Sequence, residues 1–309
     1  MERFEVNVLG CGSALPTGRH LPSSLVASVR NKLFMFDCGE GTQLQMRRLH
    51  LSFSRINCIF ITHLHGDHCF GLPGLVATMG LLGRTAALHI YGPRGVESLL
   101  RPLGESGEGE SLSFDVTVHA VDTKRETLIL EDRSVEIWSI PLRHRVACCG
   151  YVLREKPLLP HIRRDVTDFY GIPVHALRSI KEGNGWTLPD GRFIPHEQLT
   201  TPAESPRSFA YCSDTMYIPE PADSLKGVDL LYHEATFAEA DAERAAATGH
   251  STARQAALLA AAAGAKRLII GHFSARYDDE KILTEEACAV FPETIAATEG
   301  LCITIGERP

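Results

Sequence analysis

The chain has 309 residues, of which 22% are charged and 44% are hydrophobic, and its formal net charge is −7. This composition excludes an intrinsically disordered chain, which combines low hydrophobicity with high net charge. No run approaches the roughly 20 apolar residues of a membrane-spanning helix, and the N-terminal stretch lacks the apolar core of a signal peptide. We therefore expect a cytoplasmic protein with no membrane partner.

Short apolar runs bounded by Gly, Pro, Asp or Ser recur along the chain and predict β-strands. In chain order these runs are 4–9, 25–29, 33–36, 56–61, 88–91, 135–140, 208–212, 228–232, 268–270 and 301–305. Helices are predicted between the later strands. Ser251 and Thr252 can cap a helix that ends at Ala263 before Gly264, and residues 278–290 predict another. This order favours an α/β protein with helices outside its sheets.

One segment, residues 154–207, interrupts this pattern. It contains seven of the 17 prolines and no comparable apolar run, although residues 163–170 predict a short helix. We interpret it as an insertion into a single domain that spans residues 1–309, and we expect it to bury little core of its own.

A cluster of histidines follows the predicted strand 56–61 directly. His63, His65, Asp67 and His68 lie within six residues. Imidazole and carboxylate are ligands that suit zinc and related ions. A solvated polar turn is the alternative, but such turns are usually built from Gly, Asn, Ser and Asp. The nine cysteines form no C-x-x-C pair, so a cysteine-based zinc ribbon is excluded.

Three other predicted strands also end in a potential ligand: His144, Asp214 and His272. Each alone is more often a surface or hydrogen-bonded residue. Residues beyond strand ends converge on one rim of a layered α/β fold, however. Together with the histidine cluster they make seven candidates, which suits two metal ions that share a carboxylate.

These residues resemble the signature of the metallo-β-lactamase superfamily, and the surrounding motifs are similar to those of the ribonuclease Z family of tRNA 3′-processing endonucleases. The resemblance covers essentially the whole chain. It rests on residues 36–43 (FDCGEGTQ), 63–75 (HLHGDHCFGLPGL), 90–93, 213–215, 233–236 (HEAT), 249–252 (GHST) and 272–277. It implies a four-layer αββα metallo-β-lactamase sandwich with an inserted arm at about 154–207.

The resemblance also implies the role of each site residue. One zinc ion would be bound by His63, His65 and His144, a second by Asp67, His68 and His272, and Asp214 would bridge the two. Asp67 would also act as general base. His250 and Glu234 would position and protonate the leaving 3′-oxygen, although on the residues alone Glu234 could be a helix-start carboxylate and His250 a residue that precedes a helix.

Asp37 is expected to support a ligating histidine, or else to lie in a polar turn. Seven histidines, His20 among them, have no counterpart among the ligands and are predicted to be structural or on the surface.

The implied activity is zinc-dependent removal of the 3′ trailer from precursor tRNA, which leaves a 3′-hydroxyl on the tRNA and a 5′-phosphate on the trailer. In this family an arm at this place binds the tRNA, so Arg163, Arg164, Arg178 and Lys181 are expected to contact RNA. The arm departs from the family pattern at residues 174–176, where Val-His-Ala replaces a Pro-Gly-Pro-like run. A solvated linker is the alternative for this segment, and the resemblance further implies a homodimer.

Three other functions compete with this interpretation. The nearest is a small-molecule metallo-hydrolase of the same superfamily, such as a thioesterase, a lactonase or an arylsulfatase-like enzyme. A metal-free RNA-binding or scaffold protein is disfavoured because all seven ligand positions hold competent residues. A redox di-iron protein is disfavoured by His65, where di-iron relatives generally place a carboxylate. The sequence leaves open whether Zn²⁺, Mn²⁺ or Fe²⁺ is bound, and whether precursors that end in CCA are cut.

Overall fold

The computed structural model describes residues 3–101 and 112–306, which divide into two compact units. The sandwich unit comprises Met1–Asp132, Glu136–Arg154 and Arg207–Pro309, within those described ranges. The arm unit comprises Arg133–Val135 and Glu155–Pro206. None of the described helices combines the length and apolar character that crossing a bilayer requires.

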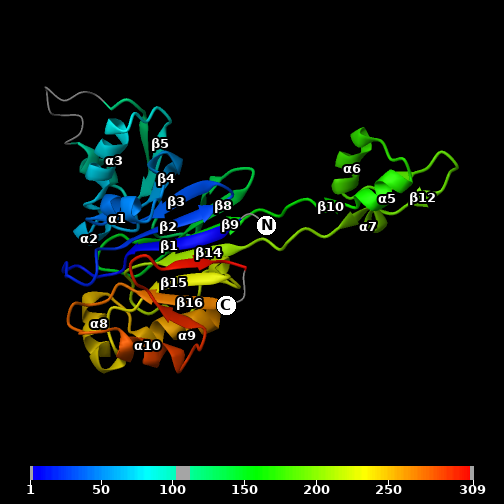
Figure 1. The fold of residues 1–309 in the computed structure, drawn as a ribbon. Coiled ribbons are helices and arrows are strands. Elements are labelled where there is room, and N and C mark those ends of the chain that lie inside the picture. The colour runs from blue at the N-terminus through cyan, green and yellow to red at the C-terminus, as the bar shows by residue number, and fades with distance from the viewer. Residues whose placement is uncertain (1–2, 102–111, 307–309) are drawn as a thin grey trace. The chain divides into compact units, whose positions relative to one another are not determined.

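The sandwich unit contains two sheets of seven strands each among the described residues (Figure 1). The first sheet has, in spatial order, β18 (Cys302–Thr304), β1 (Phe4–Gly10), β2 (Ser24–Val29), β3 (Lys32–Phe36), β4 (Ile56–Phe60), β5 (Leu88–Gly92) and β6 (Val116–Ala120). The second has β17 (Thr294–Ala296), β16 (Arg267–Gly271), β15 (Leu230–Glu234), β14 (Ser208–Cys212), β9 (Cys149–Glu155), β8 (Val135–Pro141) and β7 (Thr127–Glu131). Strands β3 to β6 run parallel to one another, as do β14 to β17.

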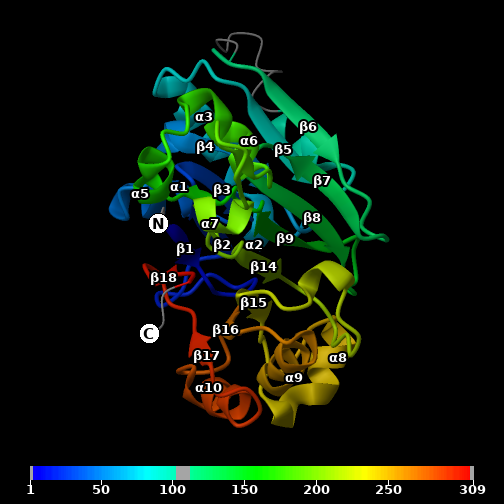
Figure 2. The ribbon, with the colours of Figure 1, turned by 90° about the vertical axis from the view of Figure 1, so that its right-hand side faces the viewer.

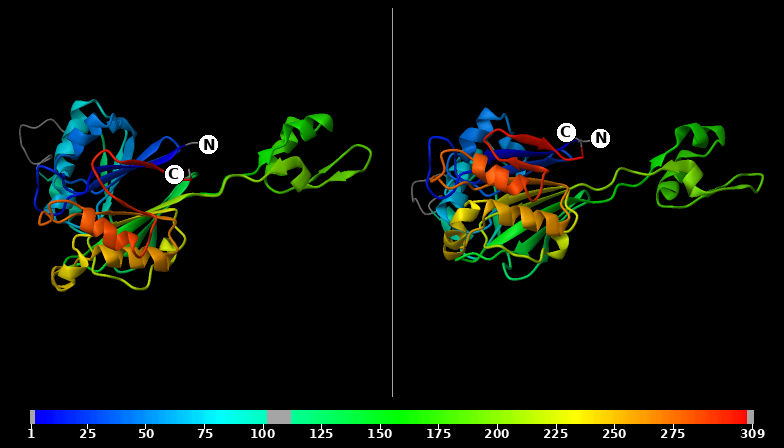
Figure 3. Two further views of the ribbon diagram at one scale, coloured as in Figure 1. Left: turned by 60° about the horizontal axis from the view of Figure 1, so that its bottom comes forward. Right: turned by 90° about the horizontal axis from the view of Figure 1, so that it is seen from below.

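Helices cover the outer faces of both sheets (Figures 1 and 3). The first sheet is covered by α1 (Thr42–Arg48) and α3 (Leu72–Leu81), and the short α2 (Gly66–Cys69) precedes α3. The second is covered by α9 (Ala253–Ala263) and α10 (Lys281–Cys288), with α8 (Ala242–Thr248) beside them. The four layers are those of the αββα sandwich that the resemblance implies, so the predicted fold class is confirmed.

Strand β4 shows why the central strands read as continuous apolar runs. Its Phe60 faces the second sheet and lies 5.3 Å, centroid to centroid, from the ring of Tyr151. Its neighbour Ile59 faces the opposite way and packs in the core beneath α1 and α3 with Met46 and Leu75. Both faces of such a strand are buried, so both sets of alternating side chains are apolar.

The predicted helix after residue 252 is confirmed as α9. Its N-terminus carries a capping box, in which the Thr252 hydroxyl accepts from the Gln255 amide and the Gln255 side chain accepts from the Thr252 amide. Gly264 ends the helix in the left-handed conformation, at a φ of 64°. The predicted helix 278–290 is shorter in the structure, at Lys281–Cys288.

The arm unit differs from the sequence expectation because it has a core of its own. Seven apolar residues are buried there: Ile172, Ala176, Leu177, Ile180, Leu188, Ile194 and Leu199. They come singly or in pairs from short elements rather than from one continuous apolar run. The sequence therefore shows no apolar stretch that would predict this core. The elements, several of which are labelled in Figure 2, are β10 (His161–Ile162), α5 (Arg164–Phe169), α6 (Leu177–Lys181), β11 (Trp186–Thr187), β12 (Phe193–Ile194), α7 (His196–Leu199) and β13 (Thr200–Thr201).

Candidate metal centre

The seven candidate ligands meet at one rim of the sandwich. His63 follows β4, His144 follows β8, Asp214 follows β14 and His272 follows β16, each within three residues of the strand end. The remaining three are on or beside α2, which begins directly after the His63 turn. A cleft of about 570 Å³ opens at this rim, and its lining includes His65, Asp67, Asp214, His250 and His272. The predicted convergence of strand ends is therefore present.

Three of the histidines form a first group. His65 Nδ1 lies 3.0 Å from His63 Nε2 and 3.3 Å from His144 Nε2. One carboxylate oxygen of Asp214, Oδ2, faces the same group at 3.5 Å from His63 Nε2 and 3.7 Å from His144 Nε2. These four residues offer ligand atoms that all lie within 4.8 Å of one another.

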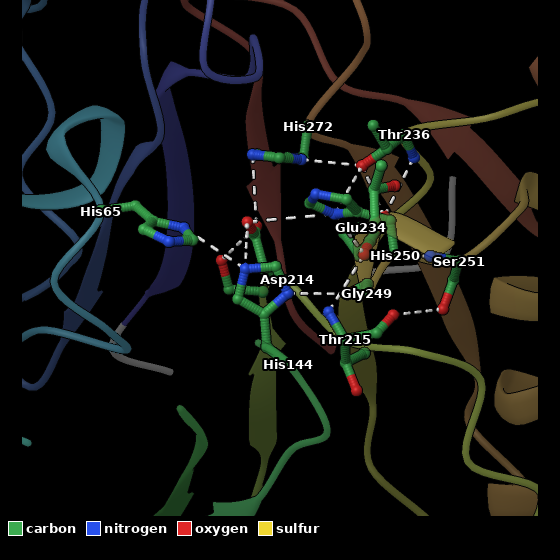
Figure 4. A network of polar contacts seen from close by, with 12 residues as sticks. His65, His144, Asp214, Thr215, Glu234, Thr236, Gly249, His250, Ser251 and His272 are labelled. Atoms are coloured by element: carbon green, nitrogen blue, oxygen red, sulfur yellow. Dashed lines mark hydrogen bonds and ion pairs between the residues drawn. The ribbon is translucent and has the colours of Figure 1, made fainter. Parts of the chain in front are cut away.

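A second group faces the other oxygen of the same carboxylate. His68 Nε2 lies 3.3 Å from His272 Nε2, and Asp67 Oδ2 lies 3.2 and 3.3 Å from these two nitrogens. Asp214 Oδ1 lies 3.3 Å from His68 Nε2 and 3.2 Å from His272 Nε2. Asp214 therefore stands between two groups of donors, with one oxygen toward each (Figure 4).

Hydrogen bonds on the outer side fix the orientation of three imidazoles. His68 Nδ1 bonds Asp37 Oδ2 at 2.7 Å, and His144 Nδ1 donates to the Gly249 carbonyl at 2.7 Å. His272 Nδ1 bonds Thr236 Oγ1 at 2.8 Å. When Nδ1 carries the proton, Nε2 presents its lone pair to the interior of the cluster, as metal-binding histidines require.

The Asp37 carboxylate is itself fully buried and held in place. It accepts hydrogen bonds from the Thr62 amide at 2.8 Å and from the Tyr211 hydroxyl at 3.0 Å. This arrangement agrees with the supporting role expected for Asp37 and excludes a solvated turn.

The backbone around the cluster adopts unusual conformations. Asp37 and His272 have φ values of 54° and 60°, in the left-handed region that L-residues seldom occupy. Gly249 has a φ of 81°, and a Cβ added there would lie 2.9 Å from His144 Nδ1. Only glycine therefore allows the 249 carbonyl to approach His144 as it does, and such strain is characteristic of functional sites.

Glu234 and His250 form a buried pair beside the cluster. Glu234 is the last residue of β15, so its interpretation as a helix-start carboxylate is wrong. Its Oε1 accepts from His250 Nδ1, from the Ser251 amide and from the Thr215 amide, each at 3.0 Å. Burial opposes protonation of His250, but the charge and hydrogen bond of Glu234 raise its pKa to about 9.

The charge balance of the cluster favours a bound cation. Burial opposes the charged form of His68, yet the carboxylates of Asp214, Asp37 and Asp67 raise its pKa well above the usual value. Burial also lowers the pKa of His144 to about 4, which keeps that imidazole neutral. Imidazoles beside ionised carboxylates that favour positive charge are the donor set that divalent metals prefer.

Two residues of the site were not singled out in the sequence. Thr236 links the Glu234–His250 pair to the metal cluster, because its hydroxyl lies 2.6 Å from Glu234 Oε2 and 2.8 Å from His272 Nδ1. Its place in the HEAT motif was the only available signal. Arg145, directly after His144, lines the cleft and adds a cation there.

The four residues predicted to contact RNA belong to the arm unit and not to this cluster. Arg163 pairs with Asp165 at 2.9 Å, and Arg178 pairs with Glu182 at 3.0 Å. No ion pair of Arg164 or Lys181 is found within residues 3–101 and 112–306. Residues 154–181 hold six basic and three acidic residues, but the arm segment 155–206 holds six basic and seven acidic ones, so the local positive surplus does not extend to the whole unit.

Comparison with known proteins places these features in a family. A sequence profile described as Beta-lactamase superfamily domain matches residues 199–273, and one described as Anti-Pycsar protein Apyc1 matches residues 4–156. The metallo-beta-lactamase fold protein YhfI from Bacillus subtilis superposes with a TM-score of 0.66 at 18% identity, covering 98% of this chain and 100% of that chain. This likeness shows the fold.

Closer relatives narrow the family. Ribonuclease Z of Bacteroides thetaiotaomicron is 55% identical over 305 residues, which cover 99% of this chain and 96% of that protein. Ribonuclease Z of Porphyromonas gingivalis is 52% identical over 305 residues, which cover 99% of this chain and 100% of that protein. The structure of human tRNase Z, short form, has a TM-score of 0.71 at 28% identity and covers 98% of this chain and 100% of that chain. The chain therefore belongs to the ribonuclease Z family of the beta-lactamase superfamily.

Proposed function

We propose that the protein is a metal-dependent endoribonuclease that removes the 3′ trailer from precursor tRNA. The cut would leave a 3′-hydroxyl on the tRNA and a 5′-phosphate on the trailer. Membership of the ribonuclease Z family over the full length supports the reaction. The observation that carries it to this chain is the position of Asp214, whose two oxygens face two separate groups of nitrogen and oxygen donors.

The donor set fits two divalent ions, which we propose to be zinc. One would be held by His63, His65 and His144, the other by Asp67, His68 and His272, with Asp214 shared. When bound, such a pair lowers the pKa of a water molecule and stabilises negative charge on the reacting phosphate. Imidazole and carboxylate also accept Mn²⁺ and Fe²⁺, so metal analysis is part of the test.

Protein groups would handle the two protons of the reaction. The Asp67 carboxylate lines the cleft, and His68 and His272 keep its pKa below the usual value against the effect of burial, so it is available to accept a proton from the attacking water. His250 carries a proton near neutral pH because Glu234 raises its pKa, and its side chain also lines the cleft. It can therefore donate that proton to the leaving 3′-oxygen, and Glu234 acts through His250 as a positioning residue.

The arm is proposed to bind the tRNA away from the cleavage site through Arg163, Arg164, Arg178 and Lys181. Arg178 is exposed, with 87% of its side chain accessible, and its contact with Glu182 is a surface pair. Surface pairs are worth at most about 1 kcal/mol, so an RNA phosphate can replace the carboxylate at small cost. The homodimer and the cytoplasmic location stay predictions from the family resemblance, and light scattering on the purified protein tests the first.

One experiment tests the proposed function directly. Purified protein is analysed for metal and incubated with a precursor tRNA labelled at its 5′ end. We expect about two metal ions in the cluster described here and a single cut, with a product extendable at its 3′-hydroxyl. Hydrolysis of small activated phosphodiesters without any cleavage of precursor tRNA would instead favour a small-molecule hydrolase.

A further inference from the structure

A second group of metal-binding side chains lies outside the site described above. It joins three parts of the sandwich unit: Cys11 directly after β1, His20 in the loop before β2, and Glu299 between β17 and β18. Cys11 Sγ lies 3.3 Å from His20 Nδ1 and 3.6 Å from Glu299 Oε1, and His20 Nδ1 lies 3.0 Å from Glu299 Oε2. One ligand atom from each of these residues lies within 4.8 Å of the other two, so the three residues form a compact triangle.

The dimensions of this triangle suit a tetrahedral zinc ion. Zinc binds sulfur at about 2.3 Å and nitrogen or oxygen at about 2.0–2.2 Å, which places two of its ligands about 3.3–3.6 Å apart. The observed separations are close to these values, at 3.3 Å between Cys11 and His20, 3.6 Å between Cys11 and Glu299 Oε1, and 3.0 Å between His20 and Glu299 Oε2. Thiolate, imidazole and carboxylate together form a set that zinc accepts readily.

The surrounding groups are also those of a metal site. His20 Nε2 bonds Glu280 Oε1 at 2.8 Å, so a carboxylate orients the ring and Nδ1 faces Cys11 and Glu299. The Leu21 amide donates to Glu299 Oε1 at 2.8 Å and fixes that carboxylate. His20, predicted to be structural or on the surface, is held between Glu299 and Glu280.

The charges of the ligands suit a divalent ion. A bound ion would displace the proton of the Cys11 thiol, and the thiolate together with the Glu299 carboxylate would balance its two positive charges.

We propose that Cys11, His20 and Glu299 form a structural zinc site separate from the catalytic cluster. The site would fasten residues 11–22 to the segment that follows His272. These segments already meet, because the Phe273 amide donates to the Cys11 carbonyl at 2.9 Å and the Ser13 amide donates to the Phe273 carbonyl at 3.1 Å. Ser13 and Pro16 line the catalytic cleft, so the bound ion would stiffen one wall of that cleft.

Cobalt substitution tests the proposal, because a cobalt–thiolate bond gives a charge-transfer band in the near ultraviolet. The proposed catalytic ligands are all nitrogen or oxygen donors, so only the new site should produce this band. We expect it in the Co²⁺-loaded wild-type protein, and we expect its loss in Cys11→Ser and a weakening in His20→Asn. The matched control Cys58→Ser, which changes a buried cysteine of β4, should retain it.

Absence of the band in the wild-type protein, or its persistence in Cys11→Ser, would overturn the proposal. If Cys11→Ser does not fold, Glu299→Gln replaces it in the test, because the glutamine side chain still accepts a hydrogen bond from the Leu21 amide. The Glu299→Gln protein should hold about one zinc equivalent less than the wild type, and an unchanged metal content would again refute the site. Asp214→Ala should keep the band, so failure of the catalytic assignment and failure of this one are distinguishable.

Discussion

The metal cluster of the sandwich unit and the basic residues of the arm unit present their charges in opposite ways. Asp214 is 2% exposed and contacts imidazoles that are themselves fixed by outer hydrogen bonds. Arg178, by contrast, is 87% exposed at its side chain and pairs with Glu182, four residues further along the same chain. Burial makes the first arrangement rigid and intolerant of change, whereas solvent makes the second adaptable. This difference is what the proposed division of labour requires, with chemistry at the buried rim of the sandwich unit and RNA binding by exposed cations of the arm.

The largest effect is expected at the shared carboxylate. Asp214→Ala removes a ligand from both proposed metals, so activity on precursor tRNA and on small phosphodiesters should fall more than about 10³-fold. Metal content of the catalytic cluster, measured on the purified variant, should drop clearly below that of the wild type. The control Asp223→Ala changes an exposed aspartate of the same unit and should leave both readouts intact. Full metal content in Asp214→Ala would show that this carboxylate is not shared.

A second substitution separates proton donation from metal binding. His250→Ala should slow precursor-tRNA cleavage by about 10²–10⁴-fold, the usual contribution of a general acid. A phosphodiester with a nitrophenolate leaving group needs no proton at that oxygen, so its hydrolysis should change much less. If the cleavage rates of both substrates fall by the same factor, His250 does not act as the proton donor to the leaving oxygen.

Removal of the arm tests whether the two units act on different parts of the substrate. Arg154 and Ser208 are opposite one another in the antiparallel pair of β9 and β14, so a short Gly/Ser turn can replace residues 156–206. Arg207 is retained because it is buried and lies over the ring of Phe4. We expect cleavage of precursor tRNA to fall at least about 100-fold, while hydrolysis of a small diester stays within about tenfold, since remote contacts help only substrates that make them. Equal loss of both activities would mean that the arm is structural.

Single charges in the arm should have smaller and graded effects. Reversal of Arg164 or Lys181 to glutamate should weaken tRNA binding and lower the slope of log affinity against log salt by about one unit per lost phosphate contact. Reversal of Arg163 or Arg178 also leaves a carboxylate partner beside a new carboxylate, so binding should weaken further. Lys281→Glu on α10 is the control for net charge. A salt dependence that no arm substitution alters would place the RNA contacts elsewhere.

The smallest effect concerns pH and stability. His89 Nδ1 lies 3.1 Å from His119 Nε2 in the sandwich unit, and burial followed by the His89 charge lowers the pKa of His119. The unfolded chain then binds a proton more readily than the folded chain, so stability present above about pH 6.5 should be lost as pH falls. His119→Gln should make the free energy of unfolding, measured in urea at several pH values, fall less steeply as pH falls. The control His161→Gln, in an exposed pair of the arm, should leave this pH dependence unchanged. An unchanged pH dependence in His119→Gln would contradict the assignment.

Much of the sandwich unit could be predicted from the sequence because local signals and burial agree there. The strand runs, the helix cap at Ser251 and Thr252 and the stop at Gly264 depend on neighbours within a few residues, so they are visible without a fold. The short strand β17, at Thr294–Ala296, was missed because three residues give no periodicity. The core of the arm was also missed, since its apolar residues come from separate short elements.

The sequence by itself determined the donor types, their order along the chain and the places where strands end. Only the tertiary structure decided that Asp214 offers one oxygen to each group, that Thr236 joins Glu234 to His272, and that Cys11, His20 and Glu299 meet. These contacts join residues up to 288 positions apart in the chain. Their distances are fixed by how the two sheets and their loops pack. No local pattern carries that information, because hydrogen bonds and metal coordination depend on separations of a few tenths of an ångström.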